Sequence, residues 1–177
     1  MVRITTYLVR IKNFIEKKIK EEDYFLAKEP EQYEEGMEID YVQPKVAYGH
    51  IAHENFAYAL EEIYKTPPYV LVGTEECTFD EESETIPISI QVCVFSEQDY
   101  EENEETKGMT IPDNLALIDA YDFLETLKKW LTEDADFEIT KPFKIGIDGS
   151  NTYPYAFGHI NFEIQTNEGT TRKFEYE

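Results

Sequence analysis

The sequence predicts an α+β fold: a mostly antiparallel sheet, a long helix packed on one face of it, and an amphipathic helix at the N-terminus. Two patterns indicate this class. Between residues 86 and 95, hydrophobic side chains alternate with mostly polar ones, which is typical of a strand with one buried face. Between residues 113 and 131, hydrophobic residues recur every three to four positions, as in a helix. Because 41% of the 177 residues are hydrophobic, we expect a single domain over residues 1–177 with one core.

Residues 1–20 are expected to form the amphipathic helix. Isoleucine and leucine recur there at helical spacing, at Ile4, Leu8, Ile11, Ile15 and Ile19. The other faces carry six basic side chains against one acidic side chain, a net charge of about +5. Residues 21–65 lose this periodicity and are expected to form a variable, extended segment with room for one short strand. Within it, residues 48–60 fit an extended arm or a short helix.

Residues 66–177 are expected to contain the α+β core. Pro67 and Pro68 precede a strand from Tyr69 to Phe79, and an acidic turn joins it to a strand from Ile86 to Phe95. Two strands with a short polar link form an antiparallel hairpin. Residues 97–108, which include six carboxylates, are expected to form an exposed loop.

A second helix is expected from Asp113 to Leu131, because Pro112 and Asp113 are typical of a helix N-terminus. Its apolar stripe is predicted to consist of Leu115, Ile118, Phe123, Leu124, Leu127 and Leu131. This helix should cover Ile90 and Val92 of the strand before it. A strand at 137–147, a turn at 148–151, a strand at 160–166 and a weaker strand at 172–176 complete the chain.

The charge of the chain argues against several classes of partner. With 38 acidic and 16 basic residues, the formal net charge is −22, which disfavours nonspecific binding to nucleic acid or to an anionic membrane. No segment approaches the roughly 20 apolar residues of a membrane span, and charged residues interrupt any signal-peptide pattern near the N-terminus. Two cysteines are too few for a disulfide framework and suit a reducing cytoplasm.

No residue pattern indicates catalysis, a metal site or a cofactor. His50 and His53 lie beside Glu54, but their spacing does not match a known ligand motif. His159 has no serine or cysteine in a nucleophile motif. The acidic runs lack the alternating oxygen ligands and central glycine of a helix–loop–helix calcium site. We therefore expect that the chain is not an enzyme, with no catalytic residue, metal or cofactor.

The aromatic segment near residue 155 has the least generic composition in the chain. Tyrosine combines a large contact area with a polar end and is favoured at protein–protein interfaces. One interpretation is an assembly interface formed by Tyr153, Pro154, Tyr155, Phe157 and Gly158. Packing of these rings inside the fold is the other.

Several segments follow one another in a recognisable order over residues 66–165. A strand begins after Thr66-Pro67-Pro68, a second spans residues 86–95, and an acidic spacer containing Tyr100 leads to Gly108 and a helix. The segment from Tyr153 to Ile164 comes last. This order resembles that of minor structural proteins encoded between the head and tail modules of tailed phages of Gram-positive bacteria, a group that includes tail-terminator proteins.

The resemblance implies a structural protein of the virion. It would form a ring, usually a homohexamer, at the head-proximal end of the tail, cap the tail tube and join it to the head connector. Its partners would be copies of itself, the tail tube protein and the neck proteins, with no sequence-specific nucleic acid binding and no membrane. It would reside in the host cytoplasm during assembly and then in the virion. In such a ring the acidic loop would face the channel or a neighbouring subunit through Glu97, Asp99, Glu101, Glu102, Glu104 and Glu105.

Two alternatives to a tail terminator remain. A head-completion or stopper protein of the neck would lie on the other side of the same joint. From a different class, an acidic DNA mimic would inhibit a host nucleic-acid-binding enzyme. The carboxylates cluster in loop-like runs and are not spread along helices or strands at phosphate-like spacing, which argues against mimicry.

Overall fold

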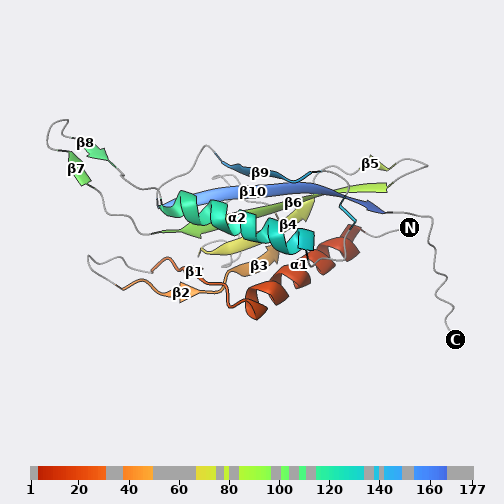
Figure 1. Ribbon diagram of the computed structural model, residues 1–177, viewed down its shortest axis with the longest axis horizontal. Helices are drawn as coiled ribbons and strands as arrows, with labels where there is room; N and C mark the ends of the chain where they lie inside the picture. The colour runs from red at the N-terminus through yellow and green to blue at the C-terminus, as the bar shows by residue number, and fades with distance from the viewer. Residues whose placement is uncertain are drawn as a thin grey trace.

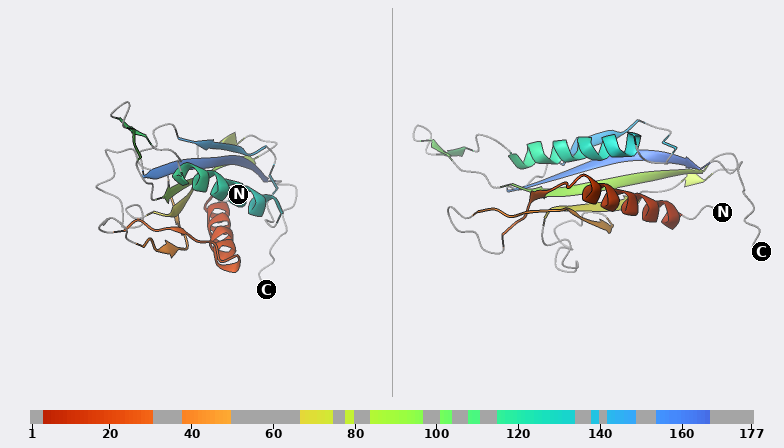
Figure 2. Two further views of the ribbon diagram at one scale, coloured as in Figure 1. Left: turned by 60° about the vertical axis from the view of Figure 1, so that its left-hand side comes forward. Right: turned by 60° about the horizontal axis from the view of Figure 1, so that its bottom comes forward.

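Two helices lie on one face of a mixed β-sheet (Figures 1 and 2). The computed structural model describes residues 4–30, 38–49, 67–74, 78–79, 84–96, 101–103, 108–110, 115–133, 138–139, 142–148 and 154–166. The expected α+β class, with a mostly antiparallel sheet and a long helix on one face, is confirmed.

The main sheet has the strand order β3–β4–β6–β10–β9, with the short strand β5 beside β6. Its strands are β3 (Lys45–Tyr48), β4 (Tyr69–Thr74), β5 (Thr78–Phe79), β6 (Glu84–Phe95), β9 (Lys144–Ile147) and β10 (Tyr155–Thr166). Neighbouring strands are antiparallel except β3 and β4, which are parallel. The predicted hairpin is confirmed, because β4 and β5 both pair antiparallel with β6.

The two longest strands, β6 and β10, form the centre of the sheet. They pair over 12 residues each, from Tyr155 opposite Phe95 to Thr166 opposite Glu84. The predicted strand at 160–166 therefore starts too late, since β10 begins at Tyr155. Pro154 and Gly158 suggest a turn in the sequence, but the ladder with β6 carries the extended backbone straight through Gly158.

Helix α1 (Ile4–Glu21) confirms the predicted amphipathic helix. Its buried residues are Ile11, Ile15 and Ile19, which face β3 and β4. On its surface, lysines pair with glutamates four residues later: Lys12 with Glu16, Lys17 with Glu21 at 3.5 Å, and Lys18 with Glu22 at 3.8 Å. Two of these glutamates lie just beyond residues 1–20, so including them lowers the net charge of this segment from about +5 to about +3.

Helix α2 (Leu115–Glu133) packs over β10 and β6, and four of the six residues in its predicted apolar stripe are buried: Phe123, Leu124, Leu127 and Leu131. Its buried residues are Ala116, Ala120, Phe123, Leu124, Leu127, Trp130 and Leu131. Leu115 and Ile118, expected in the buried stripe, are 45% and 51% exposed. Residues two apart on a helix are about 200° apart, so burial of Ala116 turns Ile118 outward. The small side chains of Ala116 and Ala120 let the helix backbone approach the sheet closely.

One hydrophobic core lies between the helices and the sheet. It contains residues of α1, α2 and the covered faces of β4, β6 and β10. Ile90 and Val92 are fully buried in it, as predicted. A smaller cluster, formed by Tyr69, Leu71 and Cys93, lies on the opposite face of the sheet, so β6 is buried on both sides.

Two small sheets lie outside the main one. The pair β1 (Leu26–Ala27) and β2 (Tyr41–Val42) follows α1 and lies near the same end of the molecule as the start of α2 (Figure 1). The pair β7 (Glu101–Asn103) and β8 (Gly108–Thr110) projects from that end, away from the main sheet (Figures 1 and 2). The predicted loop at 97–108 is therefore wrong at residues 101–103 and 108, which lie in strands.

Candidate functional site

The predicted interface segment lies mostly within β10, an inner strand of the main sheet. Tyr153 falls outside the described residues. Tyr155 is half-buried, and its hydroxyl donates a hydrogen bond to the carboxylate of Glu29. Its ring lies 6.0 Å from that of Phe95, centroid to centroid. Phe157 packs against the smaller cluster on the same sheet face. Tyr155 therefore connects the segment after α1 to the sheet, and an assembly role for Tyr155 and Phe157 stays a prediction.

Gly158 lies on the opposite face, beneath α2. A Cβ atom placed on it would come within 2.7 Å of Leu124 Cδ1 and 3.0 Å of Ile147 Cδ1. Both distances are well below ordinary carbon–carbon contact at about 3.5–4.0 Å. The glycine is therefore needed because α2 packs directly on the backbone of β10, and it lies in the core where a neighbouring subunit has no access.

The acidic residues predicted to face a channel are only partly described. Glu101 and Glu102 lie in β7, paired with Thr110 and Met109 of β8. Glu97, Asp99, Glu104 and Glu105 lie outside the described residues. A role for these six carboxylates stays a prediction.

His159 has an acidic partner that the sequence did not predict. It lies on the sheet face away from the helices, and its Nδ1 is 3.1 Å from Oδ1 of Asp148. Its ring lies over Gly146, where a Cβ atom would come within 2.8 Å of the imidazole. The two residues are 11 apart in the sequence, and no local pattern indicates that they are in contact. The pairing of β9 with β10 brings their side chains together. The pair resembles the base and orienting carboxylate of a catalytic site, without an accompanying nucleophile on the described residues.

The buried titratable groups are held in their neutral forms. Burial raises the pKa of the Cys93 thiol to about 12, so little reactive thiolate is present near neutral pH. Burial also raises the pKa of Tyr24 to about 12. The pKa of Tyr155 is raised by burial and by its bond to Glu29. Such shifts are expected for structural groups as well as for functional ones.

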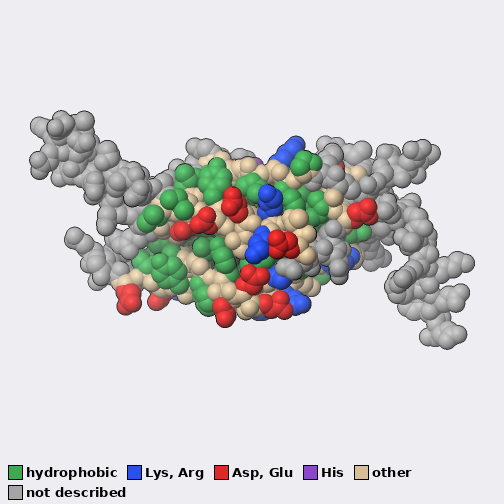
Figure 3. Space-filling model, in the orientation of Figure 1, with side chains coloured by type: hydrophobic (Ala, Val, Ile, Leu, Met, Phe, Trp, Pro, Cys, Tyr) green, Lys and Arg blue, Asp and Glu red, His purple; other side chains and the backbone are tan. Residues whose placement is uncertain are grey.

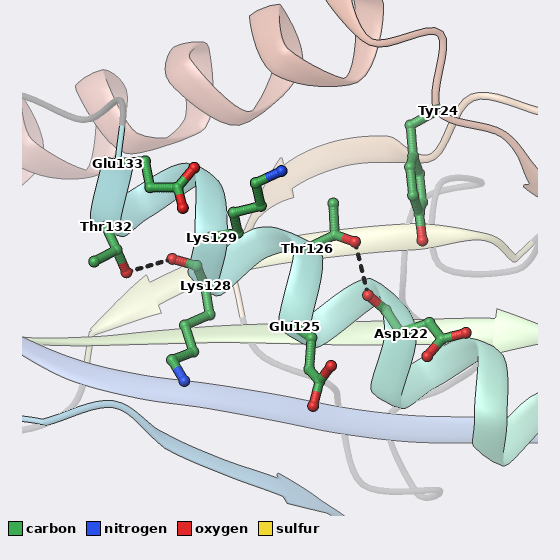
Figure 4. Close-up of a pocket in the computed structure, with 8 residues that line it drawn as sticks. All are labelled: Tyr24, Asp122, Glu125, Thr126, Lys128, Lys129, Thr132 and Glu133. Atoms are coloured by element: carbon green, nitrogen blue, oxygen red, sulfur yellow. Dashed lines mark hydrogen bonds between the residues drawn. The ribbon is translucent and has the colours of Figure 1, made fainter.

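A shallow groove runs along the outer side of α2 (Figure 4). Tyr24 lines one end, and the other seven lining residues come from α2. The hydroxyls of Thr126 and Thr132 donate to carbonyl oxygens of their own helix, at 2.8 and 2.6 Å. Lys128 and Lys129 point in different directions (Figure 4). The groove thus lacks the convergent polar groups of a small-molecule site.

No group of three potential metal ligands occurs among the described residues, and His50 and His53 lie outside them. In the described part of the chain, no helix is both long enough and apolar enough to cross a membrane.

The most distinctive surface of the described chain is apolar, and the sequence did not predict it. Seven large hydrophobic side chains are strongly exposed: Val9, Phe25, Tyr41, Tyr48, Leu115, Ile118 and Tyr121. Hydrophobic side chains gather over the first half of α2 and over β1 and β2, and carboxylates lie between these two groups (Figure 3). The helix period indicated part of this surface, since Leu115, Ile118 and Tyr121 share one face, but Leu115 and Ile118 were assigned to the core.

Comparison with protein-family models found no family that matches this sequence, and a search of curated proteins found none similar to it.

Proposed function

We propose that this chain is a structural protein of the head–tail joint of a tailed phage and acts there as a tail terminator. Copies of the chain form a ring at the head-proximal end of the tail, a homohexamer as in the proteins it resembles. The ring caps the finished tail tube and presents the surface that binds the head connector. This work is mechanical and needs neither substrate turnover nor a cofactor.

The observation that carries the proposal is that the segments resembling this family form one packed unit. β4, β6 and β10 are neighbours in the sheet, and α2 packs over β6 and β10. The contact between α2 and β10 depends on Gly158, which lies within the aromatic segment of the resemblance. If the likeness to the family were only a chance order of segments along the chain, these segments would not need to pack against one another.

A stopper protein of the neck is the alternative within the same joint. Phage particles that lack a stopper have a different defect from particles that lack a tail terminator. DNA mimicry is less favoured on the described surface. Glu16 and Glu21 of α1, and Glu22 directly after it, pair with lysines of that helix. This pairing reduces any phosphate-like array of negative charge.

The test is deletion of the gene from the phage that encodes it, followed by complementation and electron microscopy of the particles. A tail terminator predicts overlong or headless tails in the deletion strain and normal tails after complementation. Loss of a stopper predicts tails of normal length and heads that lose their DNA. Tails of normal length joined to filled heads in the deletion strain would refute the proposal.

A second experiment separates assembly from mimicry. The six carboxylates between residues 97 and 105 are changed together to glutamine or asparagine. For a ring protein, we expect the variant to fold and still terminate tails. For a mimic, the same change should abolish capture of a basic host enzyme and reduce the salt dependence of the remaining affinity.

A further inference from the structure

Helix α2 exposes a stripe of large hydrophobic side chains on the side that faces away from the sheet. Leu115, Ile118 and Tyr121 are 45%, 51% and 44% exposed, and they follow one another at intervals of three residues. Side chains at this spacing lie on one face of a helix. The core uses the opposite side of α2, so this stripe is not required for packing within the described chain.

A second group of hydrophobic side chains lies over β1 and β2 at the same end of the molecule, separated from the α2 stripe by carboxylates (Figures 1 and 3). Tyr24 stacks on Phe123 of α2 with ring centroids 4.9 Å apart, which fixes the segment after α1 beside the helix. The next residue, Phe25, is 48% exposed, and Tyr41 of β2 is 66% exposed. We call Leu115, Ile118, Tyr121, Phe25 and Tyr41 the apolar surface.

Carboxylates lie between the two parts of the apolar surface and beside them. Asp119, Asp122 and Glu125 lie on α2, again at intervals of three residues, and Asp40 precedes Tyr41. Burial, with a smaller contribution from the nearby charge of Asp122, raises the pKa of Asp119. The negative charge here is therefore incompletely solvated, and a cation placed beside it would be stabilising.

We infer that the apolar surface binds a positively charged amphipathic helix of another protein, with its apolar residues on Ile118 and Tyr121 and its lysines or arginines against the α2 carboxylates. Such a helix matches both properties of the surface, since a groove or face of this kind takes the apolar side of a partner helix. Opposite charge at the border selects for basic partners and speeds association.

A second copy of this chain is a poor occupant for this surface. Each copy carries a net charge of −22, so two acidic borders would repel each other. The basic helix of the chain, α1, directs Ile11, Ile15 and Ile19 into its own core, and Lys12, Lys17 and Lys18 already pair with glutamates. The inference concerns a different protein and does not depend on the proposed ring.

The test uses a synthetic helix of about 15 residues made of leucine and lysine, with a leucine and glutamate helix as the control probe. Binding is measured by fluorescence anisotropy at several salt concentrations. We expect the lysine helix to bind and the glutamate helix not to bind. The double variant Ile118→Gln with Tyr121→Gln should weaken binding about tenfold or more, because it removes apolar contact area without changing the charge.

Val9→Gln is the matched control, because Val9 is 43% exposed on α1 and lies outside the apolar surface. It should bind like the wild type. Asp122→Asn with Glu125→Gln should weaken binding and reduce its salt dependence. Thermal unfolding of each variant checks that the fold is intact, as expected for exposed positions.

Three outcomes would overturn the inference. Equal binding by the wild type and the Ile118/Tyr121 double variant would mean that the net charge attracts the probe without this surface. Equal binding of the two probes would remove the charge argument. Self-association of the wild type that the double variant abolishes, measured by sedimentation, would assign the surface to a second copy.

Discussion

Replacement of Gly158 by alanine tests how closely α2 approaches the sheet. The new methyl group would lie 2.7 Å from Leu124 Cδ1 and 3.0 Å from Ile147 Cδ1. Leu124 is fully buried, so its side chain has little space to move away. Overpacking of a core costs about 1–3 kcal/mol, while removal of a glycine from a strand recovers about 0.5–1 kcal/mol. We therefore expect a net loss of about 1 kcal/mol.

Urea unfolding of Gly158→Ala measures this loss, and a matched variant isolates its cause. In Gly146→Ala the methyl group meets the ring of His159 at 2.8 Å, but the His159 side chain is 33% exposed and can turn into solvent. That variant should cost less than Gly158→Ala.

A double-mutant cycle with Leu124→Ala then tests the contact itself. Leu124→Ala alone should cost about 2–5 kcal/mol, and the alanine at 158 should recover part of that loss by filling the space. Additive effects, or a Gly158→Ala protein as stable as the wild type, would refute the close packing of α2 on β10.

Two further predictions concern the core and its titratable groups. Ile90→Asp places an unpaired charge at a fully buried position and should lower the free energy of unfolding by several kcal/mol. Leu115→Asp adds an acid to the exposed first turn of α2 and should be neutral or slightly stabilising. Equal thermal midpoints for the two variants would contradict the assigned faces. Because the pKa values of Tyr24 and Cys93 rise from 10.0 and 9.0 to about 12 on folding, the unfolded chain loses these protons first, and stability should fall as pH rises from about 9 towards 12. Tyr24→Phe should flatten that decline in a urea titration at each pH, and an unchanged slope would show that Tyr24 is not buried as described.

The helix and strand patterns with a strong hydrophobic period could be predicted from the sequence. Isoleucines at helical spacing predicted α1, and alternation around Ile90 predicted β6 and its buried face. In α2 the period predicted the burial of Phe123, Leu124, Leu127 and Leu131, but it failed near the start of the helix. Ala116 and Ala120 are weakly hydrophobic and Leu115 and Ile118 strongly so, and the pattern therefore assigned Leu115 and Ile118 to the core in place of the two alanines.

Contacts between distant parts of the chain could not be predicted from the sequence pattern around either residue. The hydroxyl of Tyr155 bonds to Glu29, which is 126 residues away, and nothing near either residue indicates the pair. The parallel pairing of β3 with β4 likewise depends on how the chain returns to the sheet. For the candidate site, the residue types at Tyr155 and Phe157 indicated contact but not whether it is internal, and the structure places both against the fold.

Location of the protein in the assembled phage particle tests the central proposal most directly. The measurement is a cryo-electron microscopy reconstruction of the particle, with the density of this chain identified at each candidate position. The proposal predicts a closed ring at the head-proximal end of the tail, with cyclic symmetry that matches the tail tube. Density for the chain in the baseplate or the capsid shell, or its absence from the particle, would contradict it.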